Sequence, residues 1–315
     1  TNDTISKCVN TNPMIIDAME NVERTLGLLL ERESGRMFED FLVFHHGKFF
    51  GVGSFLKVTS HVSLLRSMDL SKARDVQDFL IKKRSSSDNG FSIRTYIRMA
   101  HALGGDFFQA MKLSDTLSVI ACFDVSGKNV SAALTTSMLG AFFATMDLGG
   151  FMRDKTPAEF VRMCNQVCCD QTPGGTYVTG VFLFVDRSRN MLEIYNCGHT
   201  QVYQFSSDDA GKRSCTIISP SMIPLGIDQI ENIDSAVRTV KITPGLRLFV
   251  YTDGLVDAQN LFGKKYGDEG LKKYILSTYR YTLDELMTSL AEEISGFVGD
   301  AVLADDITAA AIQFD

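Results

Sequence analysis

Four places in this sequence join a short apolar stretch directly to aspartate. They are Asp106 after Gly104-Gly105, Asp124 at the end of 119–123, Asp253 at the end of 248–252, and Asp305-Asp306 at the start of 307–312. Short apolar stretches next to turn residues are typical of buried β-strands. One aspartate at a strand end is an ordinary turn residue, but four such ends need a common explanation. The fold therefore has to place several carboxylates at the ends of strands.

Like charges that converge on one end of a sheet repel each other unless a cation neutralises them or they stay apart. Carboxylates with no neighbouring Cys or His pair select hard divalent ions, which here means Mg²⁺ or Mn²⁺. Glycines stand beside three of the four sites, at Gly104-Gly105, Gly127 and Gly254. They let the backbone turn sharply and bring its carbonyl groups close to an ion. The sequence therefore predicts a hard-cation site at strand ends.

Residues 91–315 alternate strand-like stretches with helical ones. The strand-like stretches are 91–97, 117–123, 178–185, 191–195, 201–205, 247–251 and 307–314. The helical stretches are 131–146, 157–169, 268–278 and 283–297. Strands outnumber helices, and several follow each other after hairpin-length gaps. This pattern predicts an α+β fold with largely antiparallel sheets and helices on their outer faces.

The first part of the chain predicts a small α/β unit. Residues 21–30 have the apolar spacing of a helix, 41–44 and 49–52 have the composition of strands, and 46–48 form the turn between them. These elements make up a compact helix-and-hairpin unit. We expect this sensor-like domain to span residues 1–65.

A second helix is predicted to lead out of this unit. Ala73, Val76, Phe79 and Leu80 form an apolar stripe that a second copy of the helix or the catalytic domain should cover. The polar, Ser-rich stretch that follows, up to the turn pair Asn89-Gly90, ends the connection. We therefore expect a helical linker over 66–90 and a catalytic domain over 91–315.

Composition excludes several classes of protein. The 315 residues are 45% hydrophobic, and 31 basic against 38 acidic residues give a net charge of −7. This balance is that of a globular protein and argues against nucleic-acid binding, which needs clustered Lys and Arg. No apolar stretch approaches the ~18 residues of a membrane-spanning helix. No signal peptide begins at Thr1. The chain does not begin with Met, which suggests that upstream sequence has been removed. We expect a cytoplasmic protein that binds neither membrane nor nucleic acid.

The seven cysteines do not suggest a disulfide framework or a zinc site. Cys164 and Cys168 share one face of a predicted helix, with Cys169 beside them. No His or second Cys pair with ligand spacing accompanies them, so buried structural thiols are the better interpretation.

Six motifs occur in the order seen in one family of enzymes. They are Gly104-Gly105-Asp106-Phe107-Phe108, Asp124-Val125-Ser126-Gly127-Lys128, Asn196-Cys197-Gly198-His199-Thr200, Pro224-Leu225-Gly226, Tyr251-Thr252-Asp253-Gly254-Leu255-Val256-Asp257-Ala258 and Asp305-Asp306-Ile307-Thr308. Through them residues 70–315 resemble the SpoIIE-type bacterial serine/threonine phosphatases, which are metal-dependent PPM phosphatases related to protein phosphatase type 2C. The resemblance implies an α-β-β-α sandwich with two Mn²⁺ or Mg²⁺ ions at one end of its two sheets.

The resemblance also implies roles for the first two aspartates. Asp124 resembles the carboxylate shared by both ions, with the backbone carbonyl of Val125 beside it. Asp106 resembles a ligand that acts through water. Two ions held in this way can activate water for attack on phosphoserine or phosphothreonine and can neutralise the leaving oxygen.

The remaining aspartates resemble ligands of the second ion. These are Asp253 and the pair Asp305-Asp306, of which the motif match favours Asp305 as the direct ligand. The predicted catalytic set is Asp106, Asp124, Asp253 and Asp305.

Four other positions are candidates for function or depart from the family pattern. Arg98 precedes the first motif and is a candidate to bind substrate phosphate, but a strand-edge arginine is the better interpretation. His199 is a candidate acid for the leaving seryl oxygen, although a turn-stabilising imidazole is favoured. Asn129 stands where the family has Gly, and Met99 where Pro is common; neither is expected to bind metal.

The chain outside the catalytic domain has weaker resemblances. Residues 13–17, 40–44 and 47–52 are similar to a CBS (cystathionine-β-synthase) module, which implies pairing with a second module and adenine nucleotides as ligands by analogy. Residues 70–80 are similar to the helix that leads into the catalytic domain of SpoIIE-type phosphatases. A homodimer through the helix at 66–84 is a further expectation.

The predicted function is dephosphorylation of a regulatory phosphoprotein, in this family typically an anti-sigma-factor antagonist of the STAS fold. One alternative is a catalytically inactive phosphatase-like scaffold in the same pathway. A second alternative is a diguanylate cyclase, because Gly104-Gly105-Asp106 resembles the start of that family's signature. Phe107 stands where its next carboxylate belongs, so this alternative is disfavoured.

Overall fold

The computed structural model describes residue 10 and residues 12–33, 36–80, 90–127, 130–147, 155–207 and 213–315. Residues 81–89, which hold the Ser-rich part of the predicted linker 66–90, and the position of Asn129 lie outside these residues. The chain divides into two compact units, Thr1–Ala73 and Arg74–Asp315. No helix in the described ranges has both the length and the apolar character that crossing a membrane requires.

The N-terminal unit contains a small mixed sheet and two helices. Its elements are β1 (Ile15–Asp17), α1 (Val22–Leu30), β2 (Phe41–His45), β3 (Lys48–Gly53) and the first part of α2 (Phe55–Leu80). β1 pairs parallel with β2, and β2 pairs antiparallel with β3. Helix α1 begins at Asn21, whose side chain accepts hydrogen bonds from the first backbone N–H groups of the helix. The predicted helix and hairpin are therefore confirmed.

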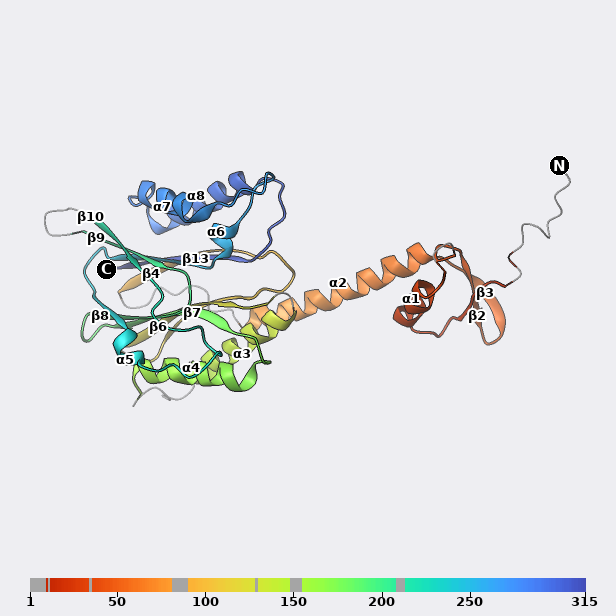
Figure 1. The fold of residues 1–315 in the computed structure, drawn as a ribbon, viewed down its shortest axis with the longest axis horizontal. Coiled ribbons are helices and arrows are strands. Elements are labelled where there is room, and N and C mark those ends of the chain that lie inside the picture. The colour runs from red at the N-terminus through yellow and green to blue at the C-terminus, as the bar shows by residue number, and fades with distance from the viewer. Residues whose placement is uncertain are drawn as a thin grey trace. The chain divides into compact units, whose positions relative to one another are not determined.

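The C-terminal unit is built on two five-stranded antiparallel sheets. The first has the order β10 (Arg213–Ile218), β9 (Val202–Ser207), β12 (Arg247–Tyr251), β13 (Ile307–Phe314) and β4 (Phe91–Arg98). The second has the order β11 (Arg238–Lys241), β8 (Met191–Cys197), β7 (Val178–Asp186), β6 (Leu117–Val125) and β5 (Asp106–Lys112). Hairpin connections join several neighbouring strands (Figure 1).

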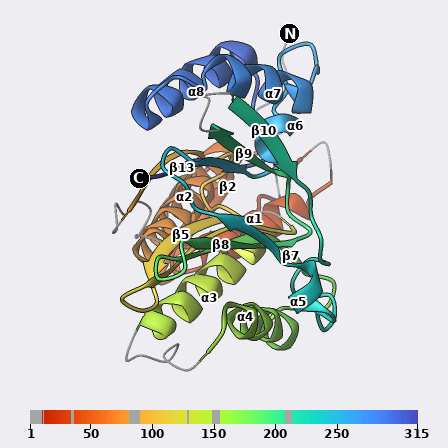
Figure 2. The same ribbon diagram turned by 90° about the vertical axis from the view of Figure 1, so that its left-hand side faces the viewer.

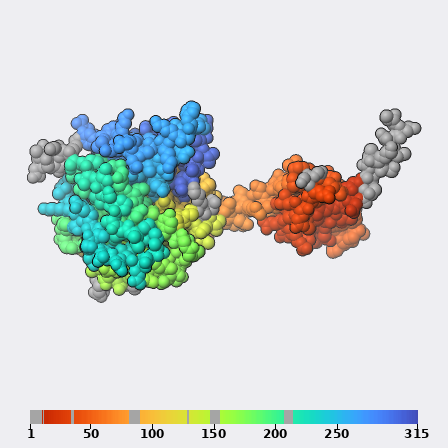
Figure 3. Space-filling view, viewed as in Figure 1, coloured from red at the N-terminus to blue at the C-terminus, as the bar shows by residue number. Residues whose placement is uncertain are grey.

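Helices cover the outer face of each sheet, and α3 (Val130–Asp147) and α4 (Pro157–Gln171) lie against the second sheet (Figure 2). α7 (Gly267–Ser277) and α8 (Leu283–Val298) lie against the first, and short α5 (Ile233–Ala236) and α6 (Gly254–Asp257) sit in connections. The blue C-terminal helices form one side of this unit's surface (Figure 3). The predicted α-β-β-α sandwich is confirmed.

Alternation along single strands explains the three apolar layers of this unit. In β6, Val119, Ala121 and Phe123 pack into the cluster under α3 and α4. Ile120 and Cys122 point the other way, into the cluster between the two sheets. A third cluster fills the space under α7 and α8. A strand buried on both faces reads as a continuous apolar stretch, which is what the sequence of β6 shows.

The apolar stripe predicted on α2 is not covered by the catalytic unit. Val76 is 60% exposed and Phe79 is 73% exposed, whereas Gln77 between them is only 4% exposed. The expectation that the catalytic domain covers the stripe is therefore wrong. The reason is that α2 turns its polar Gln77 toward the loop before β5 and toward α3, where hydrogen bonds hold it. Coverage by a second copy of the helix stays a prediction.

Candidate active site

The two sheets bring all four aspartate positions to one end of the sandwich. Asp106 begins β5 and Asp124 lies near the end of β6, and the two are directly opposite in the antiparallel register. Asp253 follows the end of β12, and the Asp305-Asp306 pair precedes β13. β12 and β13 are paired neighbours, with Tyr251 opposite Ala309, so these two chain segments also meet.

Asp124 is a carboxyl on which charges of the other sheet's loops act. Burial, and after it the charges of Asp253 and Asp305, raises the pKa of Asp124 to about 7. Asp124 belongs to one sheet, whereas Asp253 and Asp305 flank two paired strands of the other. Nearby carboxylates repel each other when ionised, and a bound cation would relieve this repulsion.

Asp106 is buried and is held by a threonine that directly follows β12 of the other sheet. Its side chain is 4% exposed, and its Oδ2 atom accepts a 2.8 Å hydrogen bond from the Thr252 hydroxyl. The backbone N–H of Thr308 donates to that same hydroxyl oxygen at 2.9 Å, which orients it. Burial, and then the charge of Asp124, raises the pKa of Asp106 well above its ordinary value.

Asp305 and Asp306 have different surroundings although they are adjacent in sequence. Asp306 is 6% exposed, and its two carboxylate oxygens accept 2.8 Å hydrogen bonds from the backbone N–H groups of Ala100 and Gly105. Asp305 is half-buried, and its Oδ1 atom accepts a hydrogen bond from the Asp306 N–H at 3.0 Å. Asp306 thus fixes the loop before β5, while Asp305 lies closer to solvent.

Val125, the predicted carbonyl ligand, is held in the same corner. Its N–H donates to the carbonyl oxygen of Gly105 at 3.2 Å. A Cβ atom at position 105 would lie 3.3 Å from the Val125 carbonyl oxygen. The chain at Gly105 therefore runs close to the backbone that follows Asp124.

The donor set of this corner suits a hard cation. Its candidate ligand atoms are carboxylate and carbonyl oxygens, and oxygen atoms are the ligands that Mg²⁺ and Mn²⁺ prefer. In the parts of the chain that the structure describes, no three His, Cys, Asp or Glu side chains are already arranged around one ion position. The charges of Asp253 and Asp305 act on Asp124, whereas oxygens of Asp106 and Asp306 accept hydrogen bonds from Thr252 and from backbone N–H groups.

The two predicted substrate-binding residues lie in different environments. Arg98 ends β4, is half-buried, and pairs in register with Ile307 beside the Asp305-Asp306 segment. His199 is 3% exposed, and its ring Nδ1 lies 3.2 Å from the Thr179 hydroxyl. The His199 N–H donates to the side chain of Asn196 at 2.9 Å, which closes the turn after β8. These contacts favour the turn-stabilising interpretation of His199.

Sequence reasoning missed Thr252, Thr308 and Gln77. Gln77 donates from Nε2 to the Gly104 carbonyl and to the Thr136 hydroxyl, both at 2.7 Å, and accepts from the Gly104 N–H at 3.2 Å. This amide ties the end of α2 to the loop that carries Asp106. The available signal was weak, because an amide among exposed helical residues normally faces solvent.

Replacing His199 with Gln should remove part of the protein's sensitivity to acid. Burial lowers the pKa of His199 from 6.5 to about 3 in the folded chain. Between these values the unfolded chain binds a proton that the folded chain does not, so the stability of the folded state falls as pH falls through this window. The contribution approaches about 1.4 kcal/mol per pH unit. Urea unfolding at about pH 6.5 and about pH 4.5 measures it.

The variant should lose less stability than wild type between these two conditions. Exposed His101 provides a matched control, because His101→Gln removes an imidazole that is already in solvent. An equal acid response in His199→Gln and wild type would mean that the buried imidazole is not kept neutral.

Comparisons with known proteins agree with this architecture. The family model described as Stage II sporulation protein E (SpoIIE) matches residues 114–315, close to two thirds of the chain. The SiaA-PP2C domain of Pseudomonas aeruginosa superposes with a TM-score of 0.65 at 19% identity, over 81% of this chain and 99% of that one. This likeness shows a PP2C, or PPM, fold. Family membership also argues against the diguanylate cyclase alternative.

Two curated relatives extend the comparison. Protein IcfG of Synechocystis is 25% identical over 269 residues, 78% of this chain and 41% of IcfG. Phosphoserine phosphatase RsbP of Bacillus subtilis is 24% identical over 189 residues, 60% of this chain and 45% of RsbP. The chain thus spans less than half the length of each of these relatives. The family match and the sandwich with converging aspartates lead to one conclusion: this chain belongs to the SpoIIE family.

Proposed function

We propose that the chain is a metal-dependent protein serine/threonine phosphatase. The observation that carries the proposal is the convergence of Asp106, Asp124, Asp253 and Asp305 at the end of the sandwich where both sheets deliver aspartates. Strand ends that concentrate negative charge and are partly solvent-accessible are suited to holding cations. Bound cations would in turn allow a phosphate dianion to approach this site. Membership of the SpoIIE family and the likeness to RsbP support the same reaction class.

The residues that would hold two Mn²⁺ or Mg²⁺ ions are Asp124, Asp253 and Asp305, together with the carbonyl of Val125. Asp106, oriented by Thr252, would support them through an intervening water. When bound, such ions supply charge neutralisation at the phosphate and lower the pKa of water. The protein's own contribution is to fix the carboxylates on rigid strand ends and to keep Asp106 and Asp306 anchored by hydrogen bonds.

The test is release of phosphate from a phosphoserine protein and from p-nitrophenyl phosphate, with Mn²⁺, with Mg²⁺ and with EDTA. We expect activity that needs either ion and disappears with EDTA. An inactive scaffold would instead bind the phosphoprotein and release no phosphate under any of these conditions. Release that is unaffected by EDTA would contradict the metal requirement.

The proposed substrate is a regulatory phosphoprotein, and a STAS-fold anti-sigma-factor antagonist is the candidate to test first. Support comes from the relationship to RsbP, which is named a phosphoserine phosphatase. The segments that follow Asp253 and precede Asp305 also carry apolar side chains that a folded partner can cover: Phe262 is 94% exposed and Val302 is 87% exposed. A small phosphate ester would make no use of such side chains.

The aspartate pair gives a prediction that separates ligand from scaffold. Asp305→Asn should raise the Mn²⁺ concentration for half-maximal activity by more than about tenfold and leave the unfolding temperature nearly unchanged. Asp306→Asn should lower stability by about 1–3 kcal/mol, because the side-chain amide has one oxygen where the carboxylate has two. Only one of the hydrogen bonds from Ala100 and Gly105 can then be kept. A metal titration and thermal unfolding of both variants decide the assignment; the reverse pattern would make Asp306 the ligand.

The N-terminal unit is proposed to be a CBS-like sensor that pairs with a second module. Its small sheet exposes large apolar side chains, with Ile15 59% exposed and Phe50 71% exposed, and faces of this kind favour pairing. Adenine nucleotides are the ligands to test, by calorimetry on the full chain with AMP and ATP. Helix α2 (Phe55–Leu80) would connect the sensor with the enzyme.

A homodimer through α2 gives a further prediction. Val76→Asp with Phe79→Asp places charges on the exposed stripe and should shift the mass measured by light scattering from dimer to monomer. The Mn²⁺ concentration for half-maximal activity (the Mn²⁺ midpoint) should change as well. The reason is that Gln77, which lies between these residues, is hydrogen-bonded to Gly104, two residues before Asp106. Leu80 is left intact since it is half-buried.

The matched control is Ser67→Asp with Ser71→Asp, which adds the same charge to exposed positions of α2 outside the stripe. It should alter neither mass nor midpoint. If the Val76/Phe79 variant keeps both wild-type values, α2 acts as an inert spacer.

A further inference from the structure

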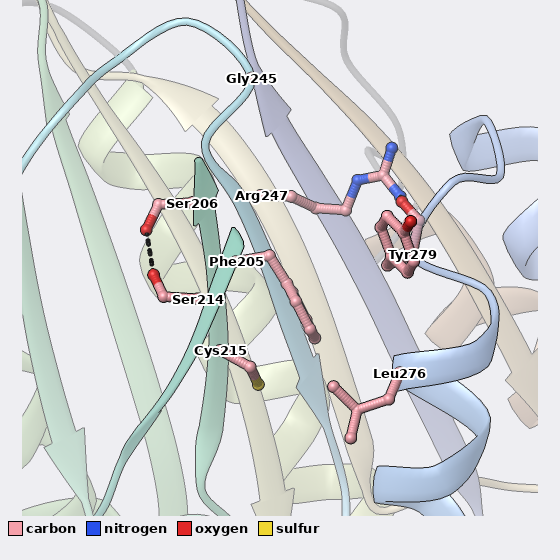
Figure 4. A pocket seen from close by; sticks show the side chains of 8 residues that line it. All are labelled: Phe205, Ser206, Ser214, Cys215, Gly245, Arg247, Leu276 and Tyr279. Atoms are coloured by element: carbon pink, nitrogen blue, oxygen red, sulfur yellow. Dashed lines mark hydrogen bonds between the residues drawn. The ribbon is translucent and has the colours of Figure 1, made fainter. Parts of the chain in front are cut away.

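A cavity of about 390 Å³ opens between the β9–β10 hairpin and the end of α7. Figure 4 shows its walls: Phe205 from β9, Cys215 from β10, Arg247 from β12, and Leu276 and Tyr279 from α7 and the segment after it. The volume lies in the range of small-molecule sites, and the lining is mostly apolar with a few polar groups. Such a cavity can enclose the body of a ligand the size of two fused rings.

The cavity lies away from the carboxylates. Arg247 is the first residue of β12, and Asp253 follows the other end of that strand. Because β12 is a single straight element, its two ends face opposite ends of the sandwich. A molecule in this cavity would therefore make no contact with the proposed catalytic residues.

Arg247 places a positive charge in the cavity wall. Its guanidinium donates to the Tyr279 carbonyl at 3.3 Å and to the Gln313 side-chain oxygen at 2.6 Å, and both acceptors are uncharged. Burial lowers the pKa of Arg247, and among the described residues that line the cavity there is no carboxylate. A half-buried guanidinium with uncharged acceptors can gain from an anion placed beside it.

Lys272 and two serine hydroxyls add positive charge and hydrogen-bonding groups to the cavity. Burial raises the pKa of Cys215, and the positive charge of Lys272 on α7 opposes the rise, so a second cation stands near the cavity. The hydroxyls of Ser206 and Ser214 lie 2.9 Å apart on the wall and can hydrogen-bond to a ligand. Positive charge at one end and apolar side chains elsewhere define the complementary ligand.

We propose that this cavity binds a small ligand with an apolar body and one anionic group, whose anion pairs with Arg247. The anion can be a carboxylate or a phosphate, since a guanidinium forms paired hydrogen bonds with either. The body packs against Phe205, Leu276 and Tyr279. This site is additional to the proposed phosphatase centre and does not depend on it.

The experiment is isothermal titration calorimetry on the full chain in EDTA with three probes that share one ring system. The probes are 2-naphthoate, 2-naphthylphosphonate and neutral 2-naphthamide. We expect at least one anionic probe to bind about tenfold or more tightly than the amide, and the better of the two identifies the class of anion. Anionic probes that bind no better than the amide would overturn the proposal.

Variants locate the binding. Arg247→Gln should abolish the preference for the anion, and Leu276→Trp, which fills the cavity from an exposed position, should weaken all three probes. Arg162→Gln, on α4, removes an arginine elsewhere in the same unit and should change nothing. Unfolding temperatures show whether each variant is folded; equal preference in Arg247→Gln and wild type would refute the assignment.

Cys215 provides an independent readout. It is an exposed thiol in the cavity wall, whereas Cys122, Cys164, Cys168 and Cys197 are buried. The bound anionic probe should slow alkylation of Cys215 by iodoacetamide, followed by mass spectrometry, and should do so equally in Asp124→Asn. Unprotected Cys215 at saturating probe would place the binding elsewhere. Neither measurement uses phosphatase activity, so a failure here leaves the proposed function intact.

Discussion

Asp124→Asn should reduce metal-dependent phosphate release by at least about 100-fold, since loss even of groups that only support metal ligands costs 10–100-fold. The reason lies in its position. Asp124 lies opposite Asp106 in its own sheet, and the charge of Asp253, at a strand end of the other sheet, acts on it, so aspartates of both sheets surround it. Asparagine preserves the shape of the side chain but removes the negative charge that cations require. Initial rates of a phosphoserine protein at saturating Mn²⁺ measure the effect.

Stability separates this role from a packing role. Without metal, Asp124→Asn should unfold at the same temperature as wild type or higher, because burial and neighbouring charges oppose ionisation at this position. Asp115→Asn, in the fully exposed turn between β5 and β6, is the control for loss of a charge. A less stable and fully active Asp124→Asn protein would overturn the site assignment.

Several of the strands that the sequence predicted have a continuous apolar pattern. β6, β7 and β13 are buried on both faces, so their sequences alone indicated them. β5 was not predicted, although six of its seven residues are buried, because it lacks β-branched residues and includes Gln109. The edge strands β10 and β11 were also missed, since their sequences are largely polar and their conformation depends on pairing with β9 and β8.

The same distinction applies to the site. The positions of the aspartates were predictable because each follows from a local event, a strand meeting a turn. The use of each oxygen was not, because it depends on residues far away in sequence. Asp306 binds the N–H groups of Ala100 and Gly105, about 200 positions earlier. Thr252 reaches Asp106 across the two sheets in the same way.

Gly254 is the position where the loop after β12 approaches the loop before β13 most closely. A Cβ atom at Gly254 would lie 1.9 Å from the carbonyl oxygen of Asp306 and 2.9 Å from its carbonyl carbon. Both are backbone atoms, and the side chain of Asp306 is itself fixed by two hydrogen bonds. The contact therefore cannot be relieved by a rotamer change. The segment that carries Asp305 would have to move away from Asp253.

Gly254→Ala is consequently expected to lower the free energy of unfolding by about 3 kcal/mol and to abolish most of the phosphatase activity, since overpacking against fixed atoms costs 1–3 kcal/mol or more. Gly296→Ala is the matched control: it lies exposed in α8 with no atom within 4 Å of its added methyl, so it should be fully active and up to about 1 kcal/mol more stable. Urea unfolding and Mn²⁺-dependent rates of the two variants test this. A shifted Asp305 should weaken metal binding even while the protein is folded. The Mn²⁺ midpoint of Gly254→Ala should therefore rise at temperatures where this variant is still folded. An unchanged midpoint in a folded variant would show that the spacing of Asp253 and Asp305 does not depend on this contact.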